Sequence, residues 1–220
     1  MMNECNNIGV SVVEFIPKLS KASKMPCESF SLPAGDYCKT GSKLRKVKGS
    51  VCYGCYAMKG NYLYKNVKAS REHNINIIKS GQWGLWIDNI VWEIKRTNTS
   101  GYFRWHDSGD IQNLEHLKAI VEVANRLDGI RFWLPTLEKK IINEAKRDGL
   151  NIPQNLTIRL SSPMVNSKPS GAWQNTSTVT TKKDMKITGE LCRSYEQGGK
   201  CLTCRACWDK EIQNITYLKH

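Results

Sequence analysis

The sequence predicts an α/β protein built on a small, partly parallel sheet. Between residues 101 and 162, short runs rich in β-branched and aromatic residues alternate with runs whose apolar residues recur at helical spacing. The connections between these runs are short, which favours adjacent parallel strands joined by right-handed crossovers. With 220 residues, 40% of them hydrophobic, the chain is long enough to bury one sizeable core.

We therefore expect a single domain, 1–220, with three parts. Cysteine-bearing loops occupy 1–64, an α/β core 65–162, and further cysteine-bearing loops 163–220, packed back on the core. Two helices, at 67–79 and 82–96, open the regular part. One face of the second helix carries Trp83, Trp86, Ile87, Ile90, Val91 and Ile94. We expect its tryptophans in the core rather than on a ligand platform.

The β-α-β-α-β core follows these helices. Its expected elements are strands at 102–106, 130–134 and 156–161 and helices at 113–127 and 137–147. Gly129 and Gly149 sit at or just past the two helix ends, where a left-handed residue is favoured. Residues 163–190 are rich in small and polar residues, which predicts a long ordered loop or hairpin.

Polar residues follow each predicted strand of the core. Parallel sheets place their ligand sites in the loops at the carboxyl ends of their strands, so we expect these residues on one rim. They are His106, Asp107, Ser108, Asp110, Thr136, Ser161 and Ser162. Asp110 can instead cap the following helix. His106 can be a metal ligand, a proton carrier or a hydrogen-bonded rim residue, and the last of these is favoured.

Eight of the nine cysteines form two groups of four, which is typical of metal ligation. Four thiolates saturate either a tetrahedral zinc or the four irons of a cubane. The groups are Cys27, Cys38, Cys52 and Cys55, and then Cys192, Cys201, Cys204 and Cys207. Cys5 is left over. Disulfides are disfavoured, because no signal peptide opens the chain and a reducing compartment is expected.

The second group has the spacing C-x2-C-x2-C with one remote cysteine, Cys192. Bacterial ferredoxins hold a 4Fe-4S cube with such a triplet, although Trp208 here replaces the usual proline. The first group, with the close pair Cys52 and Cys55, fits zinc equally well. The eight thiolates can hold two 4Fe-4S cubes, one cube and one zinc, or a single fused eight-iron cluster.

The formal net charge of +13 favours an anionic partner, of which nucleic acid is the commonest. The densest basic stretch is Lys39, Lys43, Arg45, Lys46 and Lys48. This stretch can bind phosphates, form a solvated loop, or favour an anionic cluster nearby. An A/T-rich coding genome would also enrich lysine without selection for binding. No run of 18 apolar residues is present, so a membrane-spanning protein is not expected.

Several motifs together resemble the phage gene-product-88 domain family. They are Lys24-Met-Pro-Cys27, Ser31-Leu-Pro-Ala-Gly35, Val51-Cys-Tyr-Gly-Cys-Tyr-Ala57, Phe103-Arg-Trp-His-Asp-Ser-Gly-Asp110 and Cys201-x2-Cys-x2-Cys-Trp208. The resemblance spans nearly the whole chain and implies a viral protein in the host cytoplasm, without a settled activity. The chain is also distantly similar to radical S-adenosylmethionine barrels, but it lacks their C-x3-C-x2-C motif.

These observations predict a viral iron-sulfur protein with a role in electron transfer, redox sensing or structure. One alternative is a zinc-stabilised nucleic-acid-binding protein, whose basic stretch would bind the nucleic acid. A second alternative is a radical-type cluster enzyme, in which His106, Asp107 and Asp110 would move protons beside the metal. No catalytic residue is assigned beyond these candidates.

Overall fold

The computed structural model describes residues 15–171 and 173–219, so Cys5 lies outside the described residues. The strands are β1 (Leu19–Ser20), β2 (Ser29–Phe30), β3 (Tyr102–Trp105), β4 (Arg131–Thr136), β5 (Leu156–Ser161), β6 (Thr176–Thr180), β7 (Glu190–Leu191) and β8 (Asn214–Leu218). The α-helices are α1 (Lys39–Leu44), α2 (Lys65–Ser80), α3 (Trp83–Thr97), α4 (Leu114–Arg126) and α5 (Lys139–Arg147). Short 3-10 turns are η2 (Tyr56–Met58), η3 (Gly60–Leu63), η4 (Arg193–Glu196) and η5 (Ala206–Trp208).

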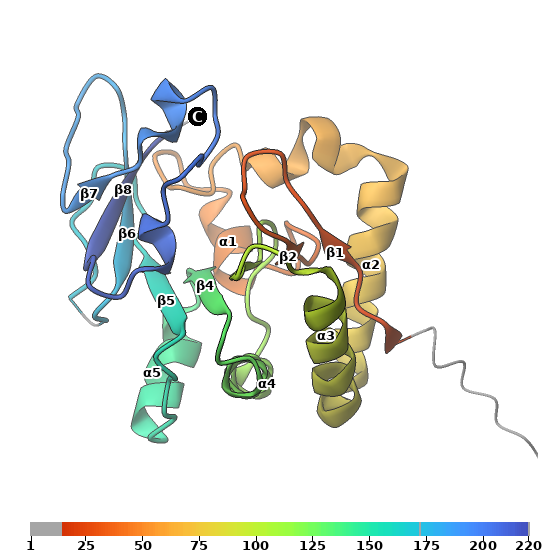
Figure 1. Ribbon diagram of the computed structural model, residues 1–220. Helices are drawn as coiled ribbons and strands as arrows, with labels where there is room; N and C mark the ends of the chain where they lie inside the picture. Colours follow the sequence, from red (N-terminus) through yellow and green to blue (C-terminus); the bar gives the residue numbers. More distant parts are fainter. Residues whose placement is uncertain (1–14, 172, 220) are drawn as a thin grey trace, which may run out of the picture.

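All eight strands form one sheet, in the order β1-β2-β3-β4-β5-β6-β8-β7 (Figure 1). Only β1 pairs antiparallel, with β2, and every other neighbouring pair is parallel. The predicted α/β class is confirmed, and the β-α-β-α-β core appears as β3-α4-β4-α5-β5. The register pairs Phe103 with Phe132 and Leu134 with Ile158, so the apolar rows of neighbouring strands stack against each other.

The sheet is larger than the three predicted strands, because the N-terminal segment contributes β1 and β2 and 163–220 contributes β6, β7 and β8. Strand β6 pairs with β8 over five residues, within a stretch interpreted from sequence as loop. Its sequence, TSTVT, lacks the apolar alternation that marks a strand. Strands β6 and β8 are nevertheless mostly buried, and hydroxyls bond from strand to strand. Thr178 Oγ1 of β6 lies 3.0 Å from Thr216 Oγ1 of β8, and Ser177 Oγ of β6 lies 3.0 Å from Ser161 Oγ of β5. Cross-strand threonine pairs replace apolar contacts here.

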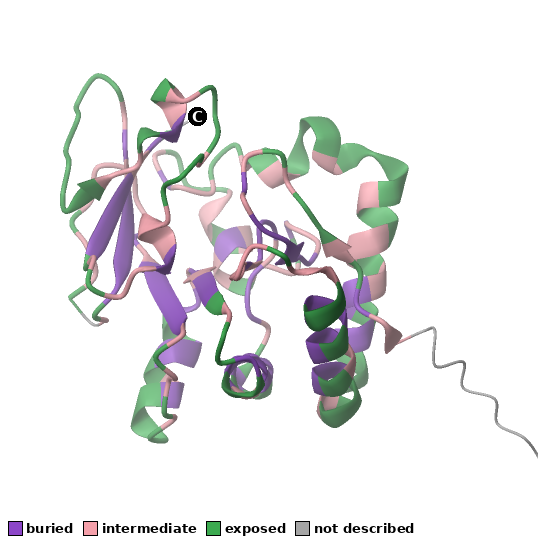
Figure 2. Ribbon diagram, viewed as in Figure 1, coloured by how far each residue is buried: buried purple, intermediate pink, exposed green. Residues whose placement is uncertain are grey.

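The main apolar core lies between the sheet and a row of helices, α3, α4 and α5. Side chains from β3 and β4 meet α3 and α4 in one cluster, which includes Trp86, Ile90, Ile94, Phe103, Trp105, Leu117, Phe132 and Leu134. Figure 2 shows these helices buried on their inner faces and exposed outside. Trp86 is fully buried and Trp83 packs against the cluster, as expected. None of the helices in residues 15–171 and 173–219 combines the length and apolarity that crossing a membrane requires.

The ends of the two core helices match the predictions only in part. Asn113 caps α4, because its Oδ1 accepts a hydrogen bond from the His116 backbone N–H at 2.8 Å. Asp110 is therefore not the cap. Gly149 has the left-handed φ of 69° expected after α5, whereas Gly129 does not adopt a positive φ. The chain leaves α4 through Leu127 instead, in an extended turn.

Candidate metal centre

The structure divides the eight described cysteines into three and five rather than four and four. Cys38, Cys52 and Cys55, which we call the rim cysteines, lie beside α1 at the carboxyl edge of the sheet. A Cβ placed on Gly41 would lie 3.5 Å from Cys52 Sγ and 3.9 Å from Cys38 Sγ, so both sulfurs face the first turn of α1. The backbone N–H of Cys55 donates to Cys52 O at 3.1 Å, which closes the turn that carries this pair.

Burial keeps the thiols of two rim cysteines, Cys38 and Cys52, protonated. Burial first, and then the nearby Asp110 and Cys55, raise the pKa of Cys38 to about 12. Burial also raises the pKa of Cys52 to about 12, with Cys55 and Asp110 adding to it. Both thiols are therefore neutral at pH 7 without a metal, and a metal that binds here must release their protons.

The remaining five, Cys27, Cys192, Cys201, Cys204 and Cys207, are the face cysteines. Cys27 and Cys207 belong to a small cluster on the sheet face opposite the main core, together with Trp133 and Trp208. The backbone N–H of Cys201 donates to Lys24 O at 3.0 Å, which brings the C-terminal loop against the segment that carries Cys27. The sequence placed Cys27 with the rim cysteines, but the structure puts it with the C-terminal group.

Charges on neighbouring thiols confirm this grouping. The pKa of Cys27 rises to about 12 through burial, Glu28 and Cys201. Burial raises the pKa of Cys201, and Cys192 and Cys204 raise it further. The pKa of Cys207 is about 12, again because of burial, with Cys192 and Cys201 contributing in the same direction. The charged neighbours with the largest effects on the pKa of Cys27, Cys201 and Cys207 belong to the face cysteines and to residues around them.

Arg159 fixes the loop that carries Cys207. This residue of β5 is fully buried, and its guanidinium donates to backbone carbonyls of one loop: Ala206 at 3.0 Å, Cys207 at 3.0 Å, Asp209 at 2.6 Å and Ile212 at 2.8 Å. Thr157 Oγ1 donates to Trp208 O at 2.8 Å, and Trp208 Nε1 donates to Phe103 O at 2.8 Å. The sheet thus holds residues 206–212 in one conformation.

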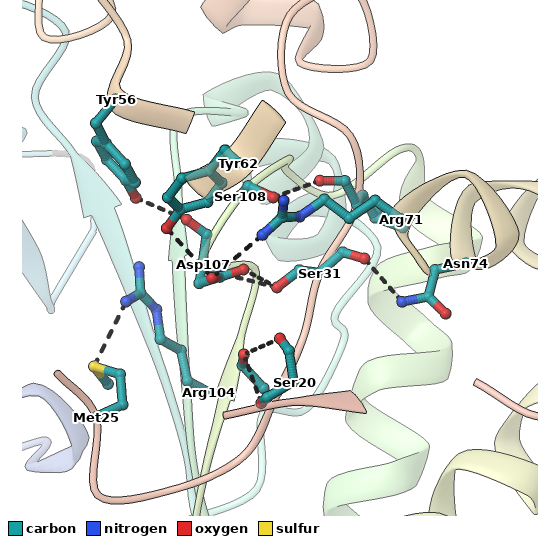
Figure 3. Close-up of polar contacts among 12 residues, drawn as sticks. Ser20, Met25, Ser31, Tyr56, Tyr62, Arg71, Asn74, Arg104, Asp107 and Ser108 are labelled. Atoms are coloured by element: carbon teal, nitrogen blue, oxygen red, sulfur yellow. Dashed lines mark hydrogen bonds and ion pairs between the residues drawn. The ribbon is translucent and has the colours of Figure 1, made fainter. Parts of the chain in front are cut away.

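Arg104 brings a second cation to the face cysteines. Its guanidinium lies 4.6 Å from the centre of the Trp133 ring and 3.7 Å from Met25 Sδ, and its Nε is buried without a hydrogen-bond partner (Figure 3). The positive charge of Arg104 lowers the pKa of Cys27 and of Cys201 against the larger effect of burial. Within residues 15–171 and 173–219, neither Arg104 nor Arg159 forms an ion pair with a carboxylate.

Asp107 anchors the segment that follows the rim cysteines. Its carboxylate accepts from Ser31 Oγ and Tyr62 Oη and lies 3.6 Å from Arg71 Nη2 (Figure 3). Its carbonyl accepts from Tyr56 Oη at 2.7 Å. Since Tyr56 follows Cys55 directly, these bonds tie the Cys52–Cys55 turn to the end of β3.

Gly109 allows the loop after β3 to pass close to the loop after β2. A Cβ on Gly109 would lie 2.5 Å from Leu32 Cβ, and the φ of 78° is left-handed. The backbone N–H of Leu32 donates to Ser108 O at 3.0 Å, and Ser108 Oγ donates to Leu32 O at 2.7 Å. Ser108 is therefore engaged with this neighbouring loop.

Asp110 and Glu138 connect the strand ends to α1. Asp110 accepts from Thr136 Oγ1 at 2.6 Å and from the Leu137 backbone N–H at 2.9 Å. Burial raises the pKa of Asp110 to about 7, although these hydrogen bonds oppose the shift. Glu138 accepts from the Thr40 backbone N–H at 2.7 Å and from Thr40 Oγ1 at 2.8 Å. Both carboxyls lie close enough to the rim cysteines for their charges to raise the pKa of Cys52.

His106 lies in the core rather than on the rim. Its φ of 54° interrupts the alternation of β3, and its ring lies 5.4 Å from the His116 ring and 6.3 Å from those of Phe30 and Trp105. Burial, aided by the charge of Arg104, lowers the pKa of His106 to about 3. Among residues 15–171 and 173–219, neither ring nitrogen of His106 finds a hydrogen-bond partner. His106 is thus a neutral core residue.

The predicted rim forms, but most of its side chains bond to neighbouring loops instead of facing open space. Ser161 Oγ pairs with Ser177 Oγ, and Ser162 Oγ donates to Lys168 O at 2.9 Å. A cavity of about 650 Å³ lies at the carboxyl ends of β4 and β5, and of the seven predicted rim residues only Ser161 lines it. Within residues 15–171 and 173–219, no three histidine, cysteine, aspartate or glutamate side chains are arranged to hold one metal ion.

The sequence-based interpretation missed three functional candidates, Arg104, Arg159 and Glu138. An arginine inside an otherwise buried strand was the available signal for Arg159, since the sequence of β5 is LTIRLS and a buried charge needs partners. The positions of Arg104 and Glu138 depend on the packing of distant loops, which no local pattern encodes.

Comparison with known proteins agrees with the motifs. No curated protein and no solved structure shows significant similarity to the chain. The family model described as Gene product 88 matches residues 13–210, which include both groups of cysteines and every strand except β8. The chain therefore belongs to the gene product 88 family.

Proposed function

We propose that this protein binds iron-sulfur clusters at two separate centres. The first is held by Cys192, Cys201, Cys204 and Cys207, with Cys27 as a fifth thiol beside them. The second is held by the rim cysteines. The observation that carries the proposal is the pair of guanidiniums beside the first centre, those of the partly buried Arg104 and the fully buried Arg159, which form no ion pair with a carboxylate in residues 15–171 and 173–219.

Charge balance supports a metal centre with four thiolates. Without metal the thiols of Cys27 and Cys207 are neutral, because burial raises the pKa of each to about 12, so they do not balance the charges of Arg104 and Arg159. A 4Fe-4S cube with four thiolates carries a net charge of about −2, so it would balance both guanidiniums. A zinc with four thiolates carries the same charge. The spacing of Cys201, Cys204 and Cys207 favours the cube, because one loop offers three sulfurs to one object.

We propose electron transfer, redox sensing or structural support as the role of the first centre. Because the chain belongs to the gene product 88 family, whose motifs resemble those of phage proteins, we propose that it acts in the cytoplasm of an infected host. Cys204→Ser tests the ligand assignment, with Cys5→Ser as the matched control. We expect iron and acid-labile sulfide to fall only in Cys204→Ser, measured after purification without oxygen. Unchanged iron in Cys204→Ser overturns the assignment, and zinc without sulfide overturns the cluster.

A cluster enzyme is a second candidate, favoured by the number of rim cysteines. Three thiolates leave the fourth iron of a cube without a protein thiolate, which is a position that a substrate can occupy. Asp110 and Glu138 lie beside this group, and the 650 Å³ cavity adjoins α1. Cleavage of S-adenosylmethionine by the reduced protein would support this candidate. No cleavage by a protein with both centres loaded would contradict it.

The alternative of a zinc-stabilised nucleic-acid-binding protein depends on the basic stretch. Its charges are divided between two surroundings: Lys39 and Lys43 line the cavity, whereas Arg45 lies 3.3 Å from Asp36. Salt-sensitive retention on DNA by a zinc-loaded, sulfide-free protein would favour this alternative over the cluster.

A further inference from the structure

The cavity beside α1 has the size and position of a small-molecule site. Its volume of about 650 Å³ falls within the range of ligand pockets in proteins. It lies at the carboxyl ends of β4 and β5, where parallel sheets bind their ligands, and the first turns of α4 and α5 border it. Leu114, Leu137, Ile141 and Leu160 give it an apolar wall.

Four lysines surround this cavity: Lys39, Lys43, Lys139 and Lys140. None of them forms an ion pair in the part of the chain that the structure describes. Three glutamates also line the cavity, of which Glu144 lies 3.9 Å from Arg147, so within the described residues four lysines face the two unpaired carboxylates of Glu115 and Glu138. The cavity therefore has an excess of free positive charge.

The start of α5 adds to this positive potential. Lys139 and Lys140 occupy the first two positions of the helix, where the helix dipole favours acidic residues instead. The N-cap residue of α5 is Glu138, whose carboxylate accepts from Thr40 and makes no cap bond to the helix, and the first turn contains no acidic residue. Each lysine at this position disfavours the start of the helix. A bound anion would reverse this effect, because the free amides of a helix start are good ligands for phosphate.

We propose that this cavity binds a phosphorylated small molecule of about nucleotide size. The phosphate lies at the start of α5 among Lys39, Lys43, Lys139 and Lys140, and the rest of the ligand packs against the apolar wall. The inference does not depend on which metal the cysteines bind. It does place the ligand next to the rim cysteines, since Lys39 follows Cys38 directly.

The test is calorimetric titration of the full-length, metal-loaded protein with inorganic phosphate and with each of the four common nucleoside monophosphates. The double variant Lys139→Glu and Lys140→Glu removes the proposed phosphate contacts, yet it places acidic residues where α5 favours them. We expect affinity to fall roughly tenfold or more, while the thermal midpoint stays equal or rises. The same charge change at Lys182 and Lys183, two exposed neighbouring lysines away from the cavity, is the control.

Saturable binding that is lost in the variant at 139 and 140 and kept in the control supports the site. Arginine at both positions should restore binding, because it keeps the charge. Absence of saturable binding for phosphate and for all four nucleotides overturns the proposal. An equal loss of affinity in both double variants also overturns it, since that result would reflect general surface charge.

Discussion

Replacing Arg159 by methionine tests the structural basis of the first centre. The substitution keeps an unbranched apolar stem and removes the guanidinium that donates to four carbonyls of residues 206–212, while the bond from Thr157 to Trp208 stays. Arg159 is 0% exposed and donates to five backbone carbonyls, at distances from 2.6 to 3.4 Å. Water cannot replace these bonds unless the loop lifts from β5.

The expected loss of stability follows from those carbonyls. Leaving a buried acceptor unsatisfied costs about 1–3 kcal/mol. Some of the loop will become hydrated, and removal of a buried charge returns part of the cost. We therefore expect the free energy of unfolding to fall by about 3 kcal/mol, with loss of the first cluster because Cys207 is no longer held in place.

Chemical denaturation followed by circular dichroism measures the first effect, and iron analysis after anaerobic reconstitution measures the second. Arg131→Met is the matched control, because Arg131 is exposed at the start of β4. Such an exposed change is expected to alter stability by no more than about 0.5 kcal/mol. If Arg159→Met matches the control in both unfolding free energy and iron content, the role assigned to this guanidinium is wrong.

Three further predictions concern the loop after β3 and the start of α4. Gly109→Ala should lower the free energy of unfolding by about 2 kcal/mol or more, because the added Cβ meets Leu32. Gly84→Ala, at an open helical position, is the control and should raise the free energy of unfolding by up to about 1 kcal/mol. Equal effects of the two substitutions in chemical denaturation would refute the close contact between Gly109 and Leu32. Asn113→Ala should lower the free energy of unfolding by about 1 kcal/mol through loss of the cap on α4. The size of this loss should not depend on whether Asp110 is present. Because the pKa of His106 is lowered to about 3 in the folded protein from about 6.5 when unfolded, the unfolded state binds more protons between these values. The free energy of unfolding should therefore fall as pH drops below about 6.5, by at most about 1.4 kcal/mol per pH unit. His106→Phe should reduce this dependence on pH in chemical denaturation measured between pH 6.5 and 4.

The regular middle of the fold was predictable, because periodicity reports burial directly. The helices at 67–79, 82–96 and 113–127 each lie within two residues of the observed bounds, since one apolar face per helix packs on the sheet. Strands β6 and β8 were not predictable in this way. They are buried through pairs of hydroxyls, and a polar strand with satisfied hydroxyls has the same composition as a loop.

The cysteines of the candidate site were predictable from the sequence, but their arrangement and the neighbouring Arg104, Arg159 and Glu138 were not. The cysteine spacing marks all eight thiols as candidate ligands, and that role stays a prediction, whereas the placement of Cys27 depends on how the chain enters β2. Strand alternation places Phe103 and Trp105 on the core face and so predicts an outward side chain at His106. The left-handed φ of His106 breaks that alternation and turns the ring inward. Backbone conformations of this kind are rare outside glycine, and sequence periodicity does not reveal them.

The division of the cysteines into two separate centres is the central claim, and iron per chain tests it most directly. We would measure iron and acid-labile sulfide in the wild type, in Cys38→Ser and in Cys207→Ser, all purified without oxygen. Two independent cubes predict about eight irons in the wild type and about four in each variant. Loss of nearly all iron in both variants would mean that all the cysteines hold one fused cluster, and that result would contradict the division.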